Sequence, residues 1–176
     1  MKKLIVLTYG VINYNLGSIG LVALIAFLFN LIPANRYIHG IDAGESGNAA
    51  LALAINVGLI ALFGLQHSIM ARPAFKRAWT KIIPEPIERS TYVLASTLLL
   101  AAIVYFWQPL GGVLWQVTDP VAVGILYGLF AIGWGILFLA SFQLNHFDLF
   151  GLRQVWLYFR GKAYTQLPFK TPWLYR

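Results

Sequence analysis

The sequence predicts an all-α integral membrane protein, a bundle of four transmembrane helices with a cytoplasmic interfacial helix. Of its 176 residues 59% are hydrophobic, and the 13 basic and 6 acidic side chains avoid four stretches: residues 4–35, 46–71, 90–118 and 120–147. Each stretch exceeds the roughly 20 residues that carry a helix across about 30 Å of hydrocarbon. An ordinary soluble domain keeps about a quarter of its residues charged, so a soluble fold is excluded.

The first two spans are predicted over residues 13–32 and 49–70. The first ends where Pro33 interrupts the apolar run, because proline cannot continue a helix hydrogen-bond ladder. In the second span, small residues recur every four positions, at Ala50, Ala54 and Gly58. That spacing favours close packing of another helix backbone.

The last two spans are predicted over residues 91–107 and 121–145. Pro84 and Pro86 suit a turn that leads into the third span. The fourth span carries a second stripe of small residues, at Gly124, Gly128, Ala131 and Gly135. We expect this stripe also to pack tightly against a neighbouring helix.

Residues 147–176 form an aromatic and basic tail. Its apolar side chains fall on one helical face, at Leu149, Leu152, Val155, Trp156 and Phe159. This pattern predicts an amphipathic helix lying on the cytoplasmic leaflet. Residues 1–176 are therefore interpreted as a single membrane domain, and the lipid bilayer is its first expected partner.

The basic residues predict the orientation. When the connections are assigned alternately to the two sides, one side carries 12 of the 13 Lys and Arg residues and the other carries Arg36 alone. Cytoplasmic loops are enriched in Lys and Arg, so both termini are expected in the cytoplasm. The net charge of +7 is then mainly a signal of topology, and nucleic acid is not an expected partner.

Two histidines are the main candidates for chemistry. His67 and His146 lie near the cytoplasmic ends of the second and fourth spans, at similar depth. Intramembrane polar residues are costly unless they are paired or line a cavity, so such residues often mark function. Each histidine could instead hydrogen-bond a neighbouring helix, and Arg89 could simply pair with Glu88. Arg72 and the adjacent basic residues are expected to set topology and contact lipid headgroups.

Other catalytic signatures are weak. His39, Asp42 and Glu45 have metal-binding side chains, but their even spacing in a Gly-rich loop is poor evidence, and no metal is expected. The chain has no cysteine, which excludes disulfides and a Cys nucleophile. Motifs of nucleotide-binding loops, serine hydrolases and zinc proteases are absent from the sequence.

Three segments resemble the methanethiol S-methyltransferase family, which is similar to nurim and the NnrU proteins and distantly related to isoprenylcysteine carboxyl methyltransferases. They are QHSIMARPAFK (residues 66–76) with PEPIERSTY (84–92), NHFDLFGLRQ (145–154) and the tail PFKTPWLYR (168–176). The resemblance spans essentially the whole chain. It implies a protein of the bacterial inner membrane that methylates a small thiol, converting methanethiol to dimethyl sulfide, with S-adenosylmethionine as donor.

The resemblance implies roles for five residues. His67 and His146 are expected on the thiol side, and Arg72, Arg89 and Arg153 are expected to contact the donor or lipid headgroups. Family members continue beyond this tail into an Arg-His-Pro-type motif and further spans. The chain is therefore expected to lack the C-terminal, cofactor-binding part of the family.

Two alternatives remain open. The first is a non-catalytic membrane protein of the nurim or NnrU kind, which donor binding would distinguish from an enzyme. The second is a small-solute carrier or lipid-binding bundle, which is disfavoured because no charged residue lies at mid-membrane and no inverted repeat is present.

Overall fold

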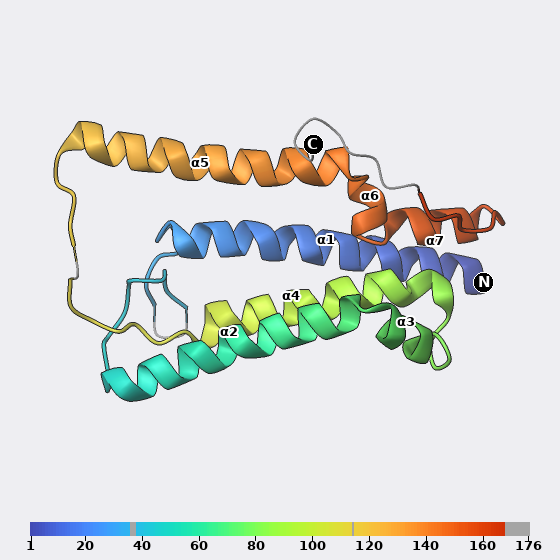
Figure 1. Ribbon diagram of the computed structural model, residues 1–176, viewed down its shortest axis with the longest axis horizontal. Helices are drawn as coiled ribbons and strands as arrows, with labels where there is room; N and C mark the ends of the chain where they lie inside the picture. The colour runs from blue at the N-terminus through green and yellow to red at the C-terminus, as the bar shows by residue number, and fades with distance from the viewer. Residues whose placement is uncertain (36–37, 114, 168–176) are drawn as a thin grey trace.

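The computed structural model describes residues 1–35, 38–113 and 115–167, and this part of the chain is helical without a strand (Figure 1). The long helices are α1 (Lys2–Leu28), α2 (Ala49–Ala71), α4 (Glu88–Phe106) and α5 (Pro120–Gln143). The short ones are α3 (Pro73–Trp79), the 3-10 turn η1 (Glu85–Ile87), α6 (His146–Leu149) and α7 (Leu152–Phe159). The all-α prediction is confirmed.

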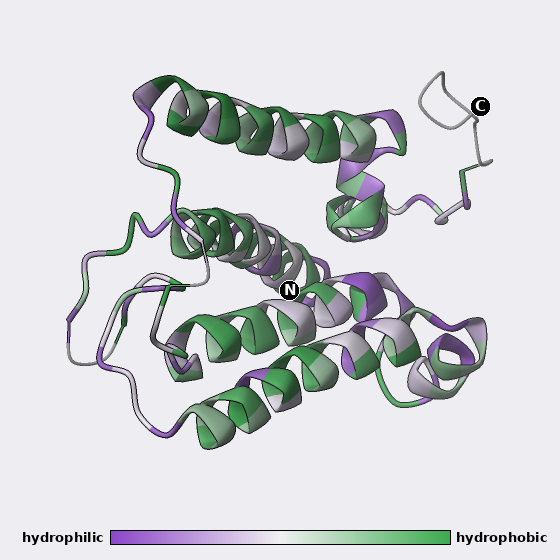
Figure 2. Cartoon of the chain, turned by 60° about the vertical axis from the view of Figure 1, so that its left-hand side comes forward, coloured by the Kyte–Doolittle hydropathy of each residue, from purple (hydrophilic) through white to green (hydrophobic). Residues whose placement is uncertain are grey.

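Four helical segments are long and apolar enough to cross a membrane: α1, α2, η1 with α4, and α5. Their lengths of 27, 23, 22 and 24 residues exceed the roughly 20 that a bilayer requires. Figure 2 shows hydrophobic residues along these helices and hydrophilic ones mainly in the connections and at one end of the bundle. The chain is an integral membrane protein with four spans.

The predicted span boundaries agree closely for the second, third and fourth helices and less well for the first. α1 begins at Lys2, eleven residues before the predicted start, and ends at Leu28 rather than at residue 32. Its N-terminal turns pack against α7, where Val155 is fully buried against Gly10. This contact holds the extra helical turns against protein, and from residue 4 onward they fall within the uncharged stretch of residues 4–35.

The packed part of the bundle consists of α1, α2 and α4. α1 and α4 approach closely because α1 presents glycines there, with Gly17 opposite Val93 and Gly20 opposite Thr97. Between α2 and the end of α4, buried Asn56 donates to the Gln108 carbonyl at 2.7 Å and accepts from the Gln108 amide at 2.9 Å. This paired contact satisfies backbone groups that the end of α4 leaves free.

The small-residue stripes do not pack as predicted. Ala50, Ala54 and Gly58 are exposed, and Gly58, Gly124, Gly128 and Gly135 have no atom near their Cβ positions. α5 has no buried residue, and it meets the segment after α1 through Phe29, which contacts Tyr127 and Phe130. Small residues permit close helix approach, but they do not by themselves produce it.

The predicted tail helix is present as α7, and the short helix α6 precedes it. The tail forms two short helices, α6 and α7, and its apolar residues do not share one environment. Val155 is buried against α1, whereas Trp156 is 48% exposed. The helix therefore packs first on protein, because Gly10 leaves room for the Val155 side chain. Residues 168–176 of the predicted tail lie outside the described residues.

Candidate functional site

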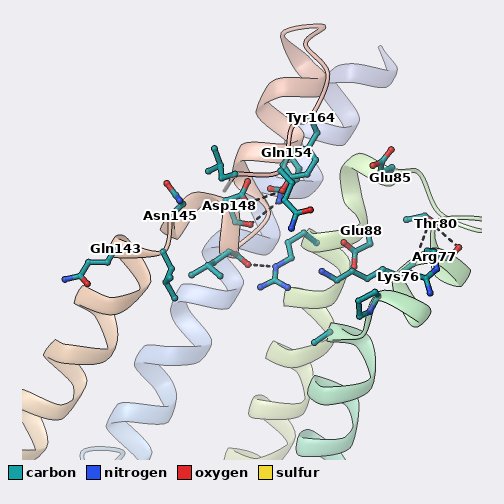
Figure 3. Close-up of a pocket in the computed structure, with 17 residues that line it drawn as sticks. Lys76, Arg77, Thr80, Glu85, Glu88, Gln143, Asn145, Asp148, Gln154 and Tyr164 are labelled. Carbon is teal, nitrogen blue, oxygen red and sulfur yellow. Dashed lines mark hydrogen bonds between the residues drawn. The ribbon is translucent and has the colours of Figure 1, made fainter. Parts of the chain in front are cut away.

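A polar cavity of about 630 Å³ lies at one end of the bundle, where α2 ends and α4 begins. We call this end of the bundle the basic end. It is the end at which α1 begins at Lys2, α2 ends before Arg72, α4 begins beside Arg89 and α5 ends at Gln143. The cavity lies between α3 and α4 on one side and α6, α7 and the end of α5 on the other (Figure 3). Its charged lining is balanced: Lys76, Arg77 and Arg89 against Glu85, Glu88 and Asp148. Its volume suits a small organic ligand.

Arg89 joins the two sides of the cavity. It lies in the first turn of α4, after the turn that contains Pro84 and Pro86, and its Nε donates to the Leu149 carbonyl of α6. Its guanidinium also lies over the Tyr92 ring, 4.5 Å from the ring centroid. These two contacts use one N–H and one face of the guanidinium, so the terminal amino groups keep donor capacity.

The cavity lining includes buried acceptors without partners. Glu88, Gln143 and Gln154 each have an inaccessible Oε1 atom with no hydrogen bond. A buried acceptor left unsatisfied costs about 1–3 kcal/mol, and more when it is charged. The alternative in which Glu88 pairs with Arg89 does not occur, since Arg153–Asp148 is the one ion pair in the described part of the chain.

Asp148 stabilises the side of the cavity formed by α6 and α7, through contacts with two side chains. Its Oδ1 lies 2.9 Å from Arg153, and its Oδ2 accepts a hydrogen bond from the Tyr164 hydroxyl at 3.1 Å. Burial raises the pKa of Tyr164 above its ordinary value, and the negative charge of Asp148 adds to the shift. Tyr164 therefore stays protonated and keeps donating to the carboxylate.

His146 is held on both ring nitrogens. Ser141 donates its hydroxyl hydrogen to the Phe138 carbonyl at 2.7 Å, so at 2.9 Å it accepts from Nδ1–H of His146. Nε2 then accepts from the Tyr14 hydroxyl at 3.1 Å. Burial lowers the pKa of His146, which agrees with this neutral form. The imidazole is 7% exposed and stacks on Phe142.

His67 occupies a separate network on α2. The Tyr92 hydroxyl lies 2.8 Å from its Nε2 and 2.9 Å from its Nδ1, and Ser96 lies 3.3 Å from Nδ1. The ring stacks on Phe63 and remains exposed on the helix surface. The Tyr92 ring also contacts the guanidinium of Arg89, which lines the cavity. His67 is therefore linked to the cavity only through Tyr92 and Arg89.

The five predicted site residues are thus dispersed. Arg89 lines the cavity, whereas Arg72 is exposed at the junction of α2 and α3, and Arg153 borders a second, apolar groove between α1 and α7. His67 and His146 have different partners, and neither lines the cavity. The cavity residues Glu88 and Gln154 were not predicted as site residues. Both lie in segments that resemble the family, residues 84–92 and 145–154, and this was the signal that could have found them.

No cluster of three or more His, Cys, Asp or Glu side chains that could hold a metal ion is found among the described residues. In the outer loop, Asp42 accepts from and donates to the side chain of Asn30, and His39 Nδ1 lies 2.9 Å from the Gly40 carbonyl. These side chains stabilise the loop backbone.

The fold and the site define a polytopic helical membrane protein with a polar, ligand-sized cavity at the basic end. The chain is 45% identical over all its residues to methanethiol S-methyltransferase of Crocosphaera subtropica and 38% identical to that of Mycobacterium tuberculosis, covering 68% and 70% of those proteins. It belongs to the methanethiol S-methyltransferase family. Human nurim is 33% identical over 146 residues, which are 76% of this chain and 55% of nurim. No protein-family model matches the chain. No solved structure matches it.

Proposed function

We propose that this protein transfers a methyl group from S-adenosylmethionine to the sulfur of methanethiol, giving dimethyl sulfide. The observation that carries the proposal is the similarity of nearly the whole chain, at 38–45% identity, to 60–70% of the length of relatives named methanethiol S-methyltransferase. The cavity at the basic end supports it, because it has the volume of a small-ligand site and charged and polar side chains in its lining.

The donor supplies a methyl group on a sulfonium cation, so that a new sulfur–carbon bond to the thiolate forms as the sulfonium carbon–sulfur bond breaks. The protein must orient the two sulfur atoms in line and exclude water. Because a cation and an anion neutralise each other in this reaction, a site of low dielectric constant favours it. The apolar bundle that adjoins the cavity lowers the dielectric constant on that side of it.

Within this mechanism, Arg89 binds the donor, since it is the one predicted cofactor residue that lines the cavity. Arg72, exposed at the end of α2, and Arg153, beside the apolar groove, are placed to contact lipid headgroups. His67 takes the thiol side, because its exposed imidazole connects through Tyr92 to Arg89 and can accept the thiol proton. Both nitrogens of His146 are engaged, which favours a positioning role for that residue.

The test is turnover by the purified protein in lipid nanodiscs, supplied with S-adenosylmethionine and methanethiol. Dimethyl sulfide is measured in the headspace by gas chromatography. We expect product from the wild type and a loss of about 100-fold or more in His67→Ala, as for removal of a general base. The adjacent, exposed Ser68→Ala serves as the matched control. Absence of product from the wild type overturns the activity, and unchanged turnover in His67→Ala overturns the role of that residue.

A non-catalytic role is the second candidate, and the similarity to nurim is the observation that favours it. The two candidates differ in ligand binding. An enzyme of the proposed kind binds S-adenosylhomocysteine, the demethylated donor, whereas a non-catalytic protein does not require such binding. Calorimetric titration with S-adenosylhomocysteine distinguishes them.

We also propose that the basic end faces the cytoplasm of a bacterium and that the bundle lies in the inner membrane. Lys76, Arg77 and Arg89 all line the cavity at this end, and the basic connections of the chain gather there. This orientation opens the cavity to the compartment in which S-adenosylmethionine is made.

A further inference from the structure

The apolar groove between α1 and α7 is separate from the cavity. It has a volume of about 530 Å³ and is lined by Leu7, Val11, Phe147, Leu152, Arg153 and Trp156. Gln154 lies two residues from both Leu152 and Trp156 and lines the cavity instead, because residues two positions apart point to roughly opposite sides of a helix. One side of α7 thus faces a polar site and the other side faces an apolar one.

The groove lining is apolar although Arg153 belongs to it. Nη1 of Arg153 donates to the Asp148 carboxylate at 2.9 Å and to the Thr165 carbonyl at 3.0 Å, so the aliphatic stem of the side chain borders the groove. Val11 and Trp156 remain exposed. Because α1 is long and apolar enough to cross a membrane, apolar side chains exposed on it meet hydrocarbon rather than water. The groove therefore suits a hydrocarbon chain.

The helices α1 and α7 run antiparallel along the groove (Figure 1). Gly10 meets Val155, and seven residues nearer the N-terminus the Lys3 ammonium lies 3.1 Å from the position that a Cβ would take at Gly161. Leu7 follows Lys3 by about one helical turn, so the two side chains lie on the same side of α1. The Lys3 ammonium therefore lies beyond Leu7, at the end of the groove nearest the N-terminus.

Arg160 places a second positive charge at the same end. It follows Trp156 by about one helical turn, and its guanidinium lies 5.8 Å from the centroid of the Trp156 ring. It directly precedes Gly161, beside which the Lys3 ammonium lies. Two positive charges are thus placed at one end of the groove, each about a turn beyond an apolar residue of its lining.

These two charges are not neutralised within the described part of the chain. Neither Lys3 nor Arg160 forms an ion pair there. Residues 149–176 contain no acidic side chain, and Glu85 and Glu88 line the cavity, on the other side of α7. Basic side chains at a membrane surface attract anionic lipids. An apolar groove that ends at two unpaired bases is complementary to a hydrocarbon chain with a negatively charged headgroup.

We propose that the groove is a binding site for an anionic phospholipid, with one acyl chain between α1 and α7 and the headgroup phosphate against Lys3 and Arg160. A zwitterionic phospholipid fills the groove equally well, but its ammonium group is repelled by the two bases. The headgroup charge therefore determines the selectivity, and each base contributes roughly fivefold to it. This inference goes beyond the proposed methyl transfer and does not depend on it.

The test is native mass spectrometry of the full chain released from nanodiscs that contain equal amounts of phosphatidylglycerol and phosphatidylethanolamine with identical acyl chains. Wild type is expected to retain phosphatidylglycerol with a preference of at least about tenfold. Lys3→Gln and Arg160→Gln are each expected to lower this preference by about fivefold. Lys81→Gln is the matched control, because it removes one base at the same end of the bundle but outside the groove. Absence of a preference in wild type, or an equal effect of all three variants, overturns the proposal.

A second pair of variants tests where the acyl chain lies. Val11→Trp fills the groove from an exposed position of α1 and is expected to weaken binding of both lipids at least about tenfold, because each buried methylene contributes to lipid binding. Val22→Trp is the control, since Val22 is exposed on α1 outside the groove. Unchanged lipid binding in Val11→Trp overturns the placement of the chain. A wild-type dimer that Val11→Trp dissociates would show that a second copy occupies the groove, and it would overturn the proposal as well.

Discussion

The Tyr14 hydroxyl of α1 lies 3.1 Å from Nε2 of His146, at the start of α6. The two residues are 132 positions apart, and their contact fixes the segment after α5 against the first helix of the bundle. Since α5 itself has no buried residue, this hydrogen bond is one of few polar links between the two parts.

Tyr14→Phe is expected to destabilise the protein by about 1–2 kcal/mol, because it removes the donor and leaves a buried imidazole nitrogen unpaired. The measurement is the free energy of unfolding in detergent. Tyr105→Phe is the control, since Tyr105 is exposed on α4 and makes no hydrogen bond among the described residues. Equal stability of the two variants would contradict the hydrogen bond.

Acidification is expected to destabilise the fold through His146. Burial lowers the pKa of this histidine in the folded protein below the ordinary value of 6.5, so the unfolded chain takes up the proton more readily. Stability should therefore be full above about pH 6.5 and fall as the pH drops through the lowered value. We expect the melting temperature of wild type to fall by a few degrees more than that of His146→Gln between pH 7.5 and 5.5. Parallel curves would argue against this histidine as the titrating group.

Gly151→Ala is expected to cost about 2 kcal/mol or more. Gly151 has φ +83°, and an added Cβ would lie 2.8 Å from the backbone nitrogen of Ser90, at the start of α4. The strained backbone alone costs about 1–2 kcal/mol in a non-glycine residue. Gly128→Ala in α5 is the matched control, because nothing lies within 4 Å of its Cβ position. That variant should lose no stability and could gain up to about 1 kcal/mol from helix propensity.

The orientation can be tested by cysteine labelling, because the natural chain has no cysteine. In intact spheroplasts, a membrane-impermeant maleimide is expected to label Ser46→Cys, which lies in the connection before α2, and to leave Lys81→Cys unlabelled. After lysis both variants should react, which shows that both thiols are accessible. The reverse pattern would place the basic end outside the cytoplasm.

Local properties of the chain account for what could be predicted from sequence. Uncharged stretches longer than the bilayer requires predict α2, α4 and α5 to within a few residues, and the family resemblance follows from motifs that are contiguous in the chain. The basic residues likewise predict which ends of the helices lie together. Each of these features depends on composition along one segment, which is a property that does not change on folding.

The partners of each side chain were decided by the tertiary structure alone. Similar depth placed His67 and His146 together in the prediction, but the rotation of α2 directs His67 to Tyr92, while the turn after α5 directs His146 to Tyr14. A pairing of Glu88 with Arg89 was one alternative, yet Arg89 bonds the Leu149 carbonyl, and Glu88 lines the cavity without an ion pair among the described residues. Hydropathy predicts which helices cross the membrane and how deep each residue lies. It does not determine how a helix is rotated about its own axis. Packing contacts such as Asn56 with Gln108, between α2 and the end of α4, set that rotation, and with it the site.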